Sequence, residues 1–134
     1  MNKKRQQEKA VSNEVIKKLK NKGYLVHRHY SITTKSIYLK IDYGVCCGIR
    51  ISDHNGKKKY RYRFNLIKKY NGPKEVVDNG YLRYFYDYKQ TDELVADVDK
   101  EKQSKLKDYG LYNYKNYMQK NAKRNIYKSF TRVA

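Results

Sequence analysis

Hydrophobic and polar residues alternate with a period of two through residues 36–66, the most regular pattern in the chain. The alternation covers three runs, at 37–42, 45–52 and 59–66. A period of two is typical of strands that bury one face and expose the other. Asn55-Gly56 lies between the second and third runs, and this dipeptide favours a two-residue hairpin loop. The sequence therefore predicts an antiparallel hairpin around Gly56, with another turn at Tyr43-Gly44.

The two faces of this predicted hairpin differ in chemistry. The apolar face, which would form a wall of the core, is expected to carry Ile49, Ile51, Tyr60, Tyr62 and Phe64. The opposite face is expected to carry Arg50, Lys59, Arg61 and Arg63. Because alternate residues of the same strands supply both walls, the core would hold the cationic wall in place as a binding surface.

Helices are predicted before and after the strands in the sequence. Residues 1–22 have apolar residues at helical spacing, and Gly23 follows as a stop. Residues 1–9 are polar, which leaves the start of this helix open to fraying. Thr91 is predicted to cap a second helix that runs to about residue 108, before Gly110 interrupts it. Helical spacing resumes over 111–128, so residues 111–134 either pack on the domain or extend as a helical arm.

Two more strands complete the predicted fold. They cover residues 24–32 and 81–88, while residues 67–80 have no clear pattern and contain the single proline. The element order predicts one α+β domain over residues 1–134. It would consist of an N-terminal helix, a four- to five-stranded antiparallel sheet and one or two C-terminal helices packed on one face, with the other face open.

The net charge of the chain indicates the expected class of partner. The chain carries 32 Lys and Arg against 13 Asp and Glu, a net charge of +19. Self-repulsion at this charge opposes compaction, so a polyanionic partner is the expected reason for it. Residues 1–70 hold 19 basic and 4 acidic residues (net +15), whereas residues 71–134 hold 13 and 9 (net +4). We therefore expect a nucleic acid, either RNA or DNA, to contact the first helix and the sheet.

The candidate contact residues follow from this distribution. Cations on one strand face lie about 6–7 Å apart and can follow a phosphate backbone, and arginine can bind phosphate with two parallel hydrogen bonds. The predicted contacts on the sheet and hairpin tip are Lys40, Arg50, Lys57, Lys58, Lys59, Arg61 and Arg63. Those on the first helix are Lys17, Lys18, Lys20 and Lys22.

The residues that catalysis or metal binding needs are scattered. His27 and His29 form an H-x-H pair, but no second ligand pair has the spacing of a structural zinc site. Asp42, Asp53 and Asp87 are isolated acids in a basic chain, although residues 87–89 have the form Asp-x-Lys found in some nucleases. We predict no catalytic residue, no metal, no cofactor and no small-molecule substrate. A metal-dependent nuclease of a mobile element is kept as the alternative.

Cysteine and tyrosine usage adds two expectations. Cys46 and Cys47 are adjacent, so on a strand they point to opposite faces and are poor disulfide partners. Since no stretch reads as a secretion signal or a membrane span, we expect a reduced, cytoplasmic location and no membrane partner. Tyrosine recurs through the C-terminal part, at Tyr109, Tyr112, Tyr114, Tyr117 and Tyr127. A protein-binding module with a Tyr-rich C-terminal surface is therefore a second alternative.

The segments SIYLKI, IRISDH and YRFNL, within residues 24–66, resemble small basic proteins of phages and other mobile elements of low-GC bacteria. Some proteins of that kind inhibit CRISPR–Cas effectors. The resemblance implies a non-catalytic inhibitor, in a bacterial host cell, that acts on the effector's guide RNA or nucleic-acid channel. Most such inhibitors are acidic mimics of DNA, and the net charge of +19 departs from that pattern. It favours contact with the nucleic acid of a Cas effector complex over mimicry of it.

Overall fold

The chain begins with a helix, passes through a series of strands and ends with helices that return to the sheet. The computed structural model describes residues 3–33, 35–52, 63–78 and 80–134. The helices are α1 (Lys3–Asn21), α2 (Thr91–Tyr109) and α3 (Leu111–Ala122), with a short 3-10 helix η1 (Asn125–Lys128). The strands are β1 (Val26–Tyr30), β2 (Ile37–Ile41), β3 (Cys47–Ser52), β4 (Arg63–Ile67), β5 (Glu75–Asp78), β6 (Tyr81–Asp87) and β7 (Thr131–Arg132).

The strands form one mixed sheet in the order β5-β6-β4-β3-β2-β1-β7. Strands β3, β4 and β6 are parallel to one another, and the other neighbouring pairs are antiparallel. The predicted α+β class is confirmed. The predicted number of strands, four to five, is smaller than the seven observed, and the predicted antiparallel arrangement is wrong for the β3–β4 and β4–β6 pairs. The sequence pattern missed β5, which lies in the stretch without a clear pattern, and β7, which has two residues.

The hairpin predicted around Gly56 is also wrong. Ile49 pairs with Phe64 and Ile51 pairs with Leu66 in a parallel register, and a two-residue loop joins only antiparallel strands. Period-two alternation gives the faces of a strand but not its direction, and that is why the error arose. Residues 53–62, with the Asn-Gly dipeptide, Tyr60 and Tyr62, lie outside the described residues.

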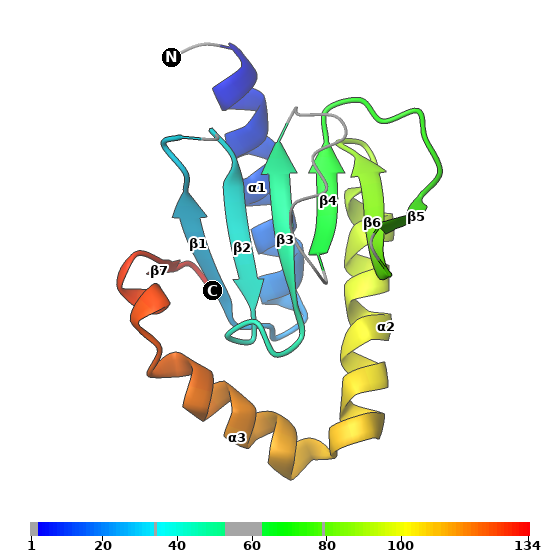
Figure 1. Cartoon of the computed structure of the whole chain (residues 1–134). Coiled ribbons are helices and arrows are strands. Elements are labelled where there is room, and N and C mark those ends of the chain that lie inside the picture. Colours follow the sequence, from blue (N-terminus) through cyan, green and yellow to red (C-terminus); the bar gives the residue numbers. More distant parts are fainter. Residues whose placement is uncertain (1–2, 34, 53–62, 79) are drawn as a thin grey trace.

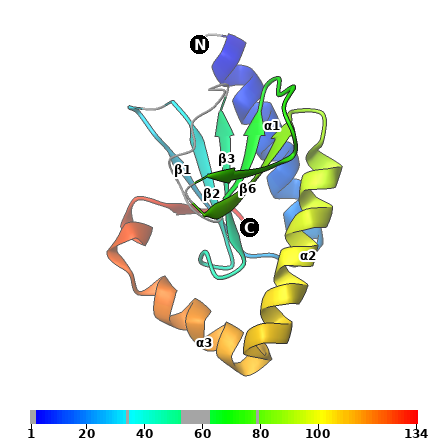
Figure 2. The same ribbon diagram turned by 45° about the vertical axis from the view of Figure 1, so that its right-hand side comes forward.

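The core lies between one face of the sheet and two helices. Figures 1 and 2 show α1 and α2 on the same side of the sheet, as predicted. Side chains with at most 1% exposure fill this layer from both sides: Val15, Leu19, Leu94 and Val98 from the helices, and Val26, Leu39, Ile41, Ile49, Ile51, Leu66 and Tyr86 from the sheet. Each buried aliphatic side chain contributes roughly 1.5–3 kcal/mol of transfer free energy, so this layer dominates folding.

Local signals set the end of α1 and the start of α2. Gly23 follows α1 at a φ of 84°, a left-handed conformation that glycine adopts without strain. At the start of α2 the expected cap is shifted by one residue. Gln90 is the capping residue, and Thr91 is the first helical residue. The Thr91 hydroxyl instead accepts a 2.7 Å hydrogen bond from Lys18 Nζ and so ties α2 to α1.

The C-terminal arm, which we define as residues 110–134, turns back on the domain. In Figure 1, α3 passes beneath the lower end of the sheet and the chain then rises to the edge strand β1. There β7 pairs with β1, matching Arg132 with His27, and the Val133 amide donates to the Val26 carbonyl. The helix predicted over 111–128 therefore ends at Ala122. The arm is attached to the sheet at its far end, and α3 lies beneath the end of the sheet instead of on the face that α1 and α2 cover.

Asp42 fixes the near end of the arm. This carboxylate is 3% exposed and lies just beyond β2. It accepts hydrogen bonds from the Leu25 amide (3.1 Å) and the Tyr114 hydroxyl of α3 (2.6 Å), and it pairs with Lys102 of α2 (3.3 Å). Burial, together with the bond to Asp42, raises the pKa of Tyr114, which therefore stays a donor. One buried carboxylate thus joins β1, β2, α2 and α3.

We expect Asp42→Ala to lower the free energy of unfolding by about 3 kcal/mol, because it leaves buried donors without an acceptor. Asp42→Asn should cost less, since asparagine keeps an acceptor and tolerates the φ of 52° at this position. Urea denaturation measures both, with the exposed Asp108→Ala as a control that should change stability by less than about 0.5 kcal/mol. Equal stability of Asp42→Ala and Asp108→Ala would contradict this role.

Candidate nucleic-acid interface

Positive and negative charge separate sharply in the C-terminal half. All 9 acidic residues of 71–134 lie at or before Asp108. Residues 109–134 hold 6 basic residues and no acid: Lys115, Lys120, Lys123, Arg124, Lys128 and Arg132. All six are exposed. All charged side chains of the C-terminal arm are therefore basic, although the net charge of residues 71–134 as a whole is only +4.

Two acids of α2 pair with lysines at the end of the first helix. Asp92 pairs with Lys18 at 2.7 Å, and Asp99 pairs with Lys22 at 2.6 Å. The hydrogen bond to Asp92 raises the pKa of Lys18. Burial opposes ionisation of Asp99, but the hydrogen bonds from Lys22 and Tyr24 outweigh it and lower the pKa of that carboxyl. Two of the four lysines predicted on α1 thus also stabilise the helix pair.

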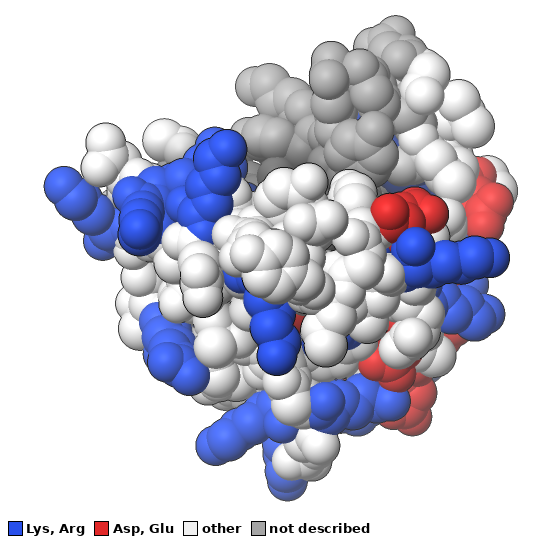
Figure 3. Space-filling model, turned by 90° about the horizontal axis from the view of Figure 1, so that it is seen from below, with Lys and Arg blue, Asp and Glu red and all other residues white. Residues whose placement is uncertain are grey.

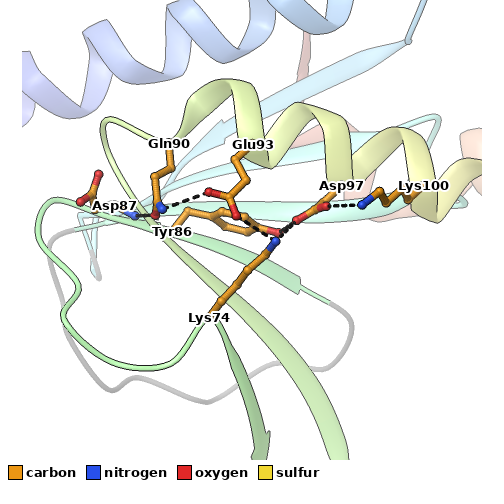
Figure 4. Close-up of polar contacts among 7 residues, drawn as sticks. All are labelled: Lys74, Tyr86, Asp87, Gln90, Glu93, Asp97 and Lys100. Atoms are coloured by element: carbon orange, nitrogen blue, oxygen red, sulfur yellow. Dashed lines mark hydrogen bonds and ion pairs between the residues drawn. The ribbon is translucent and has the colours of Figure 1, made fainter.

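A second cluster of acids, at the start of α2, surrounds Lys74 (Figure 4). Lys74 Nζ lies 2.9 Å from Glu93 and 2.6 Å from Asp97, and the Tyr86 hydroxyl donates to Asp97 at 2.7 Å. Burial raises the pKa of Tyr86 well above its usual range, with the bond to Asp97 adding to the effect. The cluster fastens the loop before β5 to α2 and leaves each carboxylate with a cation or a hydroxyl.

The surface around α3 reflects this division. Figure 3 views the molecule from below, the end at which α3 lies, and Asp and Glu gather on the right, the side of α2 in Figure 1. Lys and Arg spread over the left and lower edges and also lie among the acids on the right. In this view the acidic side chains therefore gather on the side of α2, whereas basic side chains occur on several sides.

Helix α3 also exposes large apolar rings and chains. Leu111 is 58% exposed, Tyr112 is 78% exposed and Tyr117 is 44% exposed, whereas Tyr114 points inward to Asp42. Lys115 and Lys120 are exposed on the same helix. Aromatic rings among cations are the usual composition of surfaces that bind single-stranded nucleic acid.

Aromatic contacts seat the end of the arm on the sheet face opposite the helices. The Tyr127 ring lies 5.2 Å from His27 and 5.1 Å from Tyr43 between ring centroids, and Phe130 lies 5.3 Å from His29. His29 Nδ1 donates to the Ser129 carbonyl at 2.9 Å. Burial is the largest cause that raises the pKa of Tyr127, to about 12. These contacts hold η1 in a fixed position against β1 and β2.

A cleft of about 330 Å³ remains between this seated segment and the sheet. We call it the Lys40 cleft. Its wall on the sheet includes His29, Tyr38 and Lys40, and its wall on the arm includes Ile126, Ser129 and Phe130. Lys40 Nζ lies 5.8 Å from the centroid of the Phe130 ring. A cation and aromatic rings from two parts of the chain therefore face a common space.

The structure distributes the predicted contact residues over several places. Lys17 and Lys20 are exposed on α1, Lys18 and Lys22 form the ion pairs described above, and Lys40 lines the cleft. Arg50 is on the predicted face but only 3% exposed, and its guanidinium donates to the Ser36 hydroxyl. Lys57, Lys58, Lys59 and Arg61 lie outside the described residues, as does the side chain of Arg63 on β4.

The arm cations were missed at the sequence level. Averaging charge over residues 71–134 merged the acidic α2 with the basic arm. A shorter window would have shown that acids stop at Asp108 while Lys and Arg continue to Arg132. The signal was therefore present in the sequence, but the fold was needed to show that the arm lies beside Lys40.

The described residues offer little for metal or acid–base chemistry. Among them, no group of three or more His, Cys, Asp or Glu is placed to hold a metal ion. Asp42 is bonded to Leu25, Lys102 and Tyr114, and Asp87 Oδ1 accepts a hydrogen bond from the Lys89 amide. The nuclease alternative stays a prediction: Asp42 and Asp87 have these structural partners, and Asp53 lies outside the described residues. Across the same residues, no helix combines the length and apolar character needed to span a membrane.

Comparison with protein families, with curated proteins and with solved structures finds no match to this chain.

His27 makes the seating of the arm sensitive to pH. The imidazole is 6% exposed between the Tyr43 and Tyr127 rings. Burial, and then repulsion from Arg132, lowers its pKa below the ordinary value of about 6.5. The folded state therefore binds fewer protons than the unfolded state, and stability must fall as pH drops below about 6.5.

We expect wild-type protein to lose more stability between pH 7.5 and pH 5.5 than His27→Phe, which keeps a ring but cannot be protonated. Thermal melts of both proteins at the two pH values measure the difference. Identical losses in the two proteins would show that His27 does not titrate in this window.

Proposed function

We propose that this protein is a non-catalytic nucleic-acid-binding protein whose principal contact surface is the C-terminal arm. The observation that carries the proposal is the run of six exposed cations without an acid over residues 109–134. The arm is attached at both ends, at Asp42 through Tyr114 and at β1 through β7. Cations on a segment that is held at both ends lose less conformational freedom on binding than those of a flexible tail would.

The dimensions of the arm suit a phosphate backbone. Helix α3 has 12 residues and is therefore about 18 Å long. Phosphates of one duplex strand follow one another at about 3.4 Å along the helix axis, so α3 spans about five of them. The last turn of α1 ends at the same end of the molecule as α3 (Figures 1 and 2). We therefore retain the exposed Lys17 and Lys20, together with Lys40, as proposed secondary contacts.

The biological setting remains the one that the sequence predicts. A protein of a phage or mobile element that inhibits a CRISPR–Cas effector would place this cationic arm on the guide RNA or in the nucleic-acid channel. Many phosphates are exposed there, and a basic arm can bind them without reading sequence. The inhibitor hypothesis therefore needs no activity beyond nucleic-acid binding.

We expect affinity for nucleic acid to fall steeply with salt, because each lysine–phosphate contact releases counterions. The triple variant Lys120→Gln, Lys123→Gln, Arg124→Gln should weaken binding at least about tenfold and lower the slope of log affinity against log salt by about 2. Fluorescence anisotropy with a labelled oligonucleotide at several salt concentrations measures both quantities.

The matched control removes three exposed lysines elsewhere: Lys68→Gln, Lys69→Gln and Lys89→Gln. It lowers net charge by the same amount, so a general charge effect would weaken both proteins equally. Equal loss in the two triple variants, or an affinity that does not depend on salt, would overturn the proposal.

The exposed apolar residues of α3 support a second candidate function, a protein-binding module. Leu111 and Tyr112 are the two most exposed large hydrophobic residues of the arm, and aromatic residues are enriched in protein interfaces. If this candidate is correct, a protein partner should co-purify after nuclease treatment and be lost with Leu111→Ser, Tyr112→Ser. It should be retained by the triple arm variant that lacks three cations. Loss of the partner on nuclease treatment would exclude this candidate.

A further inference from the structure

The Lys40 cleft has the composition of a site for one unpaired nucleotide. We infer that the cleft receives a single nucleotide, with its base among the rings and its phosphate near Lys40. The protein would then prefer single-stranded nucleic acid to duplex. This inference rests on the proposed nucleic-acid-binding function and adds the class of ligand.

The rings that line the cleft come from both walls. The His29 ring lies 5.3 Å from Phe130 and 6.4 Å from Tyr38 between centroids, so it stands within contact range of an aromatic side chain from the arm and another from β2. A flat base can stack on an aromatic face whatever its sequence. The cleft therefore offers stacking surfaces without requiring a particular base.

Hydrogen bonding fixes the orientation of one of these rings. The Ser129 carbonyl can only accept, so His29 Nδ1 must carry the proton in the 2.9 Å bond between them. In neutral imidazole the other ring nitrogen, Nε2, is then an acceptor. His29 is therefore held in one tautomer and brings a hydrogen-bond acceptor to the lining of the cleft, where the amino groups of bases are natural donors.

Charge complements the anionic part of a nucleotide. Lys40 belongs to the lining, and none of the lining residues is acidic. Lys128 is exposed on η1, one residue before Ser129 of the cleft wall. The cationic segment thus continues up to the wall of the cleft, so a strand bound along the arm can extend into it.

Size limits the ligand to one nucleotide that is not base-paired. The volume of about 330 Å³ is at the lower end of the range for small-molecule sites. A base within a duplex is stacked and paired, and it must be turned out at a cost before it can enter a pocket. A single strand avoids that cost, and stacking of one base on an aromatic ring raises affinity by roughly 5- to 150-fold.

The test compares a single-stranded oligonucleotide with a duplex of the same sequence by fluorescence anisotropy at one moderate salt concentration. We expect the wild-type protein to bind the single strand at least about tenfold more tightly. Phe130→Leu, which keeps an apolar side chain but removes the ring, should weaken single-strand binding about fivefold or more. It should change duplex binding less than twofold. Tyr30→Leu removes an exposed ring outside the cleft and should change neither affinity.

Cross-linking provides a readout that does not depend on folding of a variant. Wild-type protein irradiated with a single strand that contains 5-iodouracil should yield adducts at Tyr38, His29 or Phe130, identified by mass spectrometry. Equal affinity for single strand and duplex, or adducts only outside the cleft, would overturn the inference. In that case the proposed binding of nucleic acid by the C-terminal arm would still stand if the triple arm variant loses affinity. A protein that binds neither form of nucleic acid would overturn both.

Discussion

The buried carboxylate of Asp42 is the interaction on which the position of the C-terminal arm depends. A charged group in this setting is stable only while its donors surround it, and these donors come from β1, α2 and α3. What Asp42 adds is direction: the Tyr114 hydroxyl can reach it only when α3 turns beneath the sheet, and that turn carries the chain back to β1.

The position of the arm matters because of how charge is distributed along the chain. Lysines at the end of the first helix and before β5 pair with Asp92, Asp97 and Asp99 of α2, so these acids hold neighbouring elements together. The basic residues beyond Asp108 have no acids within their own segment. Folding therefore concentrates positive charge on the arm and places the end of the arm on the sheet face opposite the helices, where Lys40 and the aromatic residues around His29 form a cleft. The nucleic-acid binding that we propose would use both features together.

The sequence predicted the parts of this fold that depend on local pattern. Alternation placed Leu39, Ile49 and Phe64 on the core face, and helical spacing placed Val15 and Leu19 against it. It could not give the direction of β4, because a strand has the same period in both directions. It also could not show that Arg50, although opposite the core, is covered and bonded to Ser36. The position of the arm could not be predicted from local patterns, because the contact between Tyr114 and Asp42 spans 72 residues. Strand β7 likewise forms only because β1 offers it an edge to pair with.

The most direct test of the central claim is lysine footprinting with and without a bound oligonucleotide. A reagent that acylates exposed amines, read out by mass spectrometry, reports each lysine separately within one protein. The account predicts that nucleic acid protects Lys115, Lys120, Lys123 and Lys128, while the exposed Lys68 and Lys69 at the other end of the sheet keep their reactivity. Unchanged reactivity of the four arm lysines in the complex, with protection elsewhere, would contradict it.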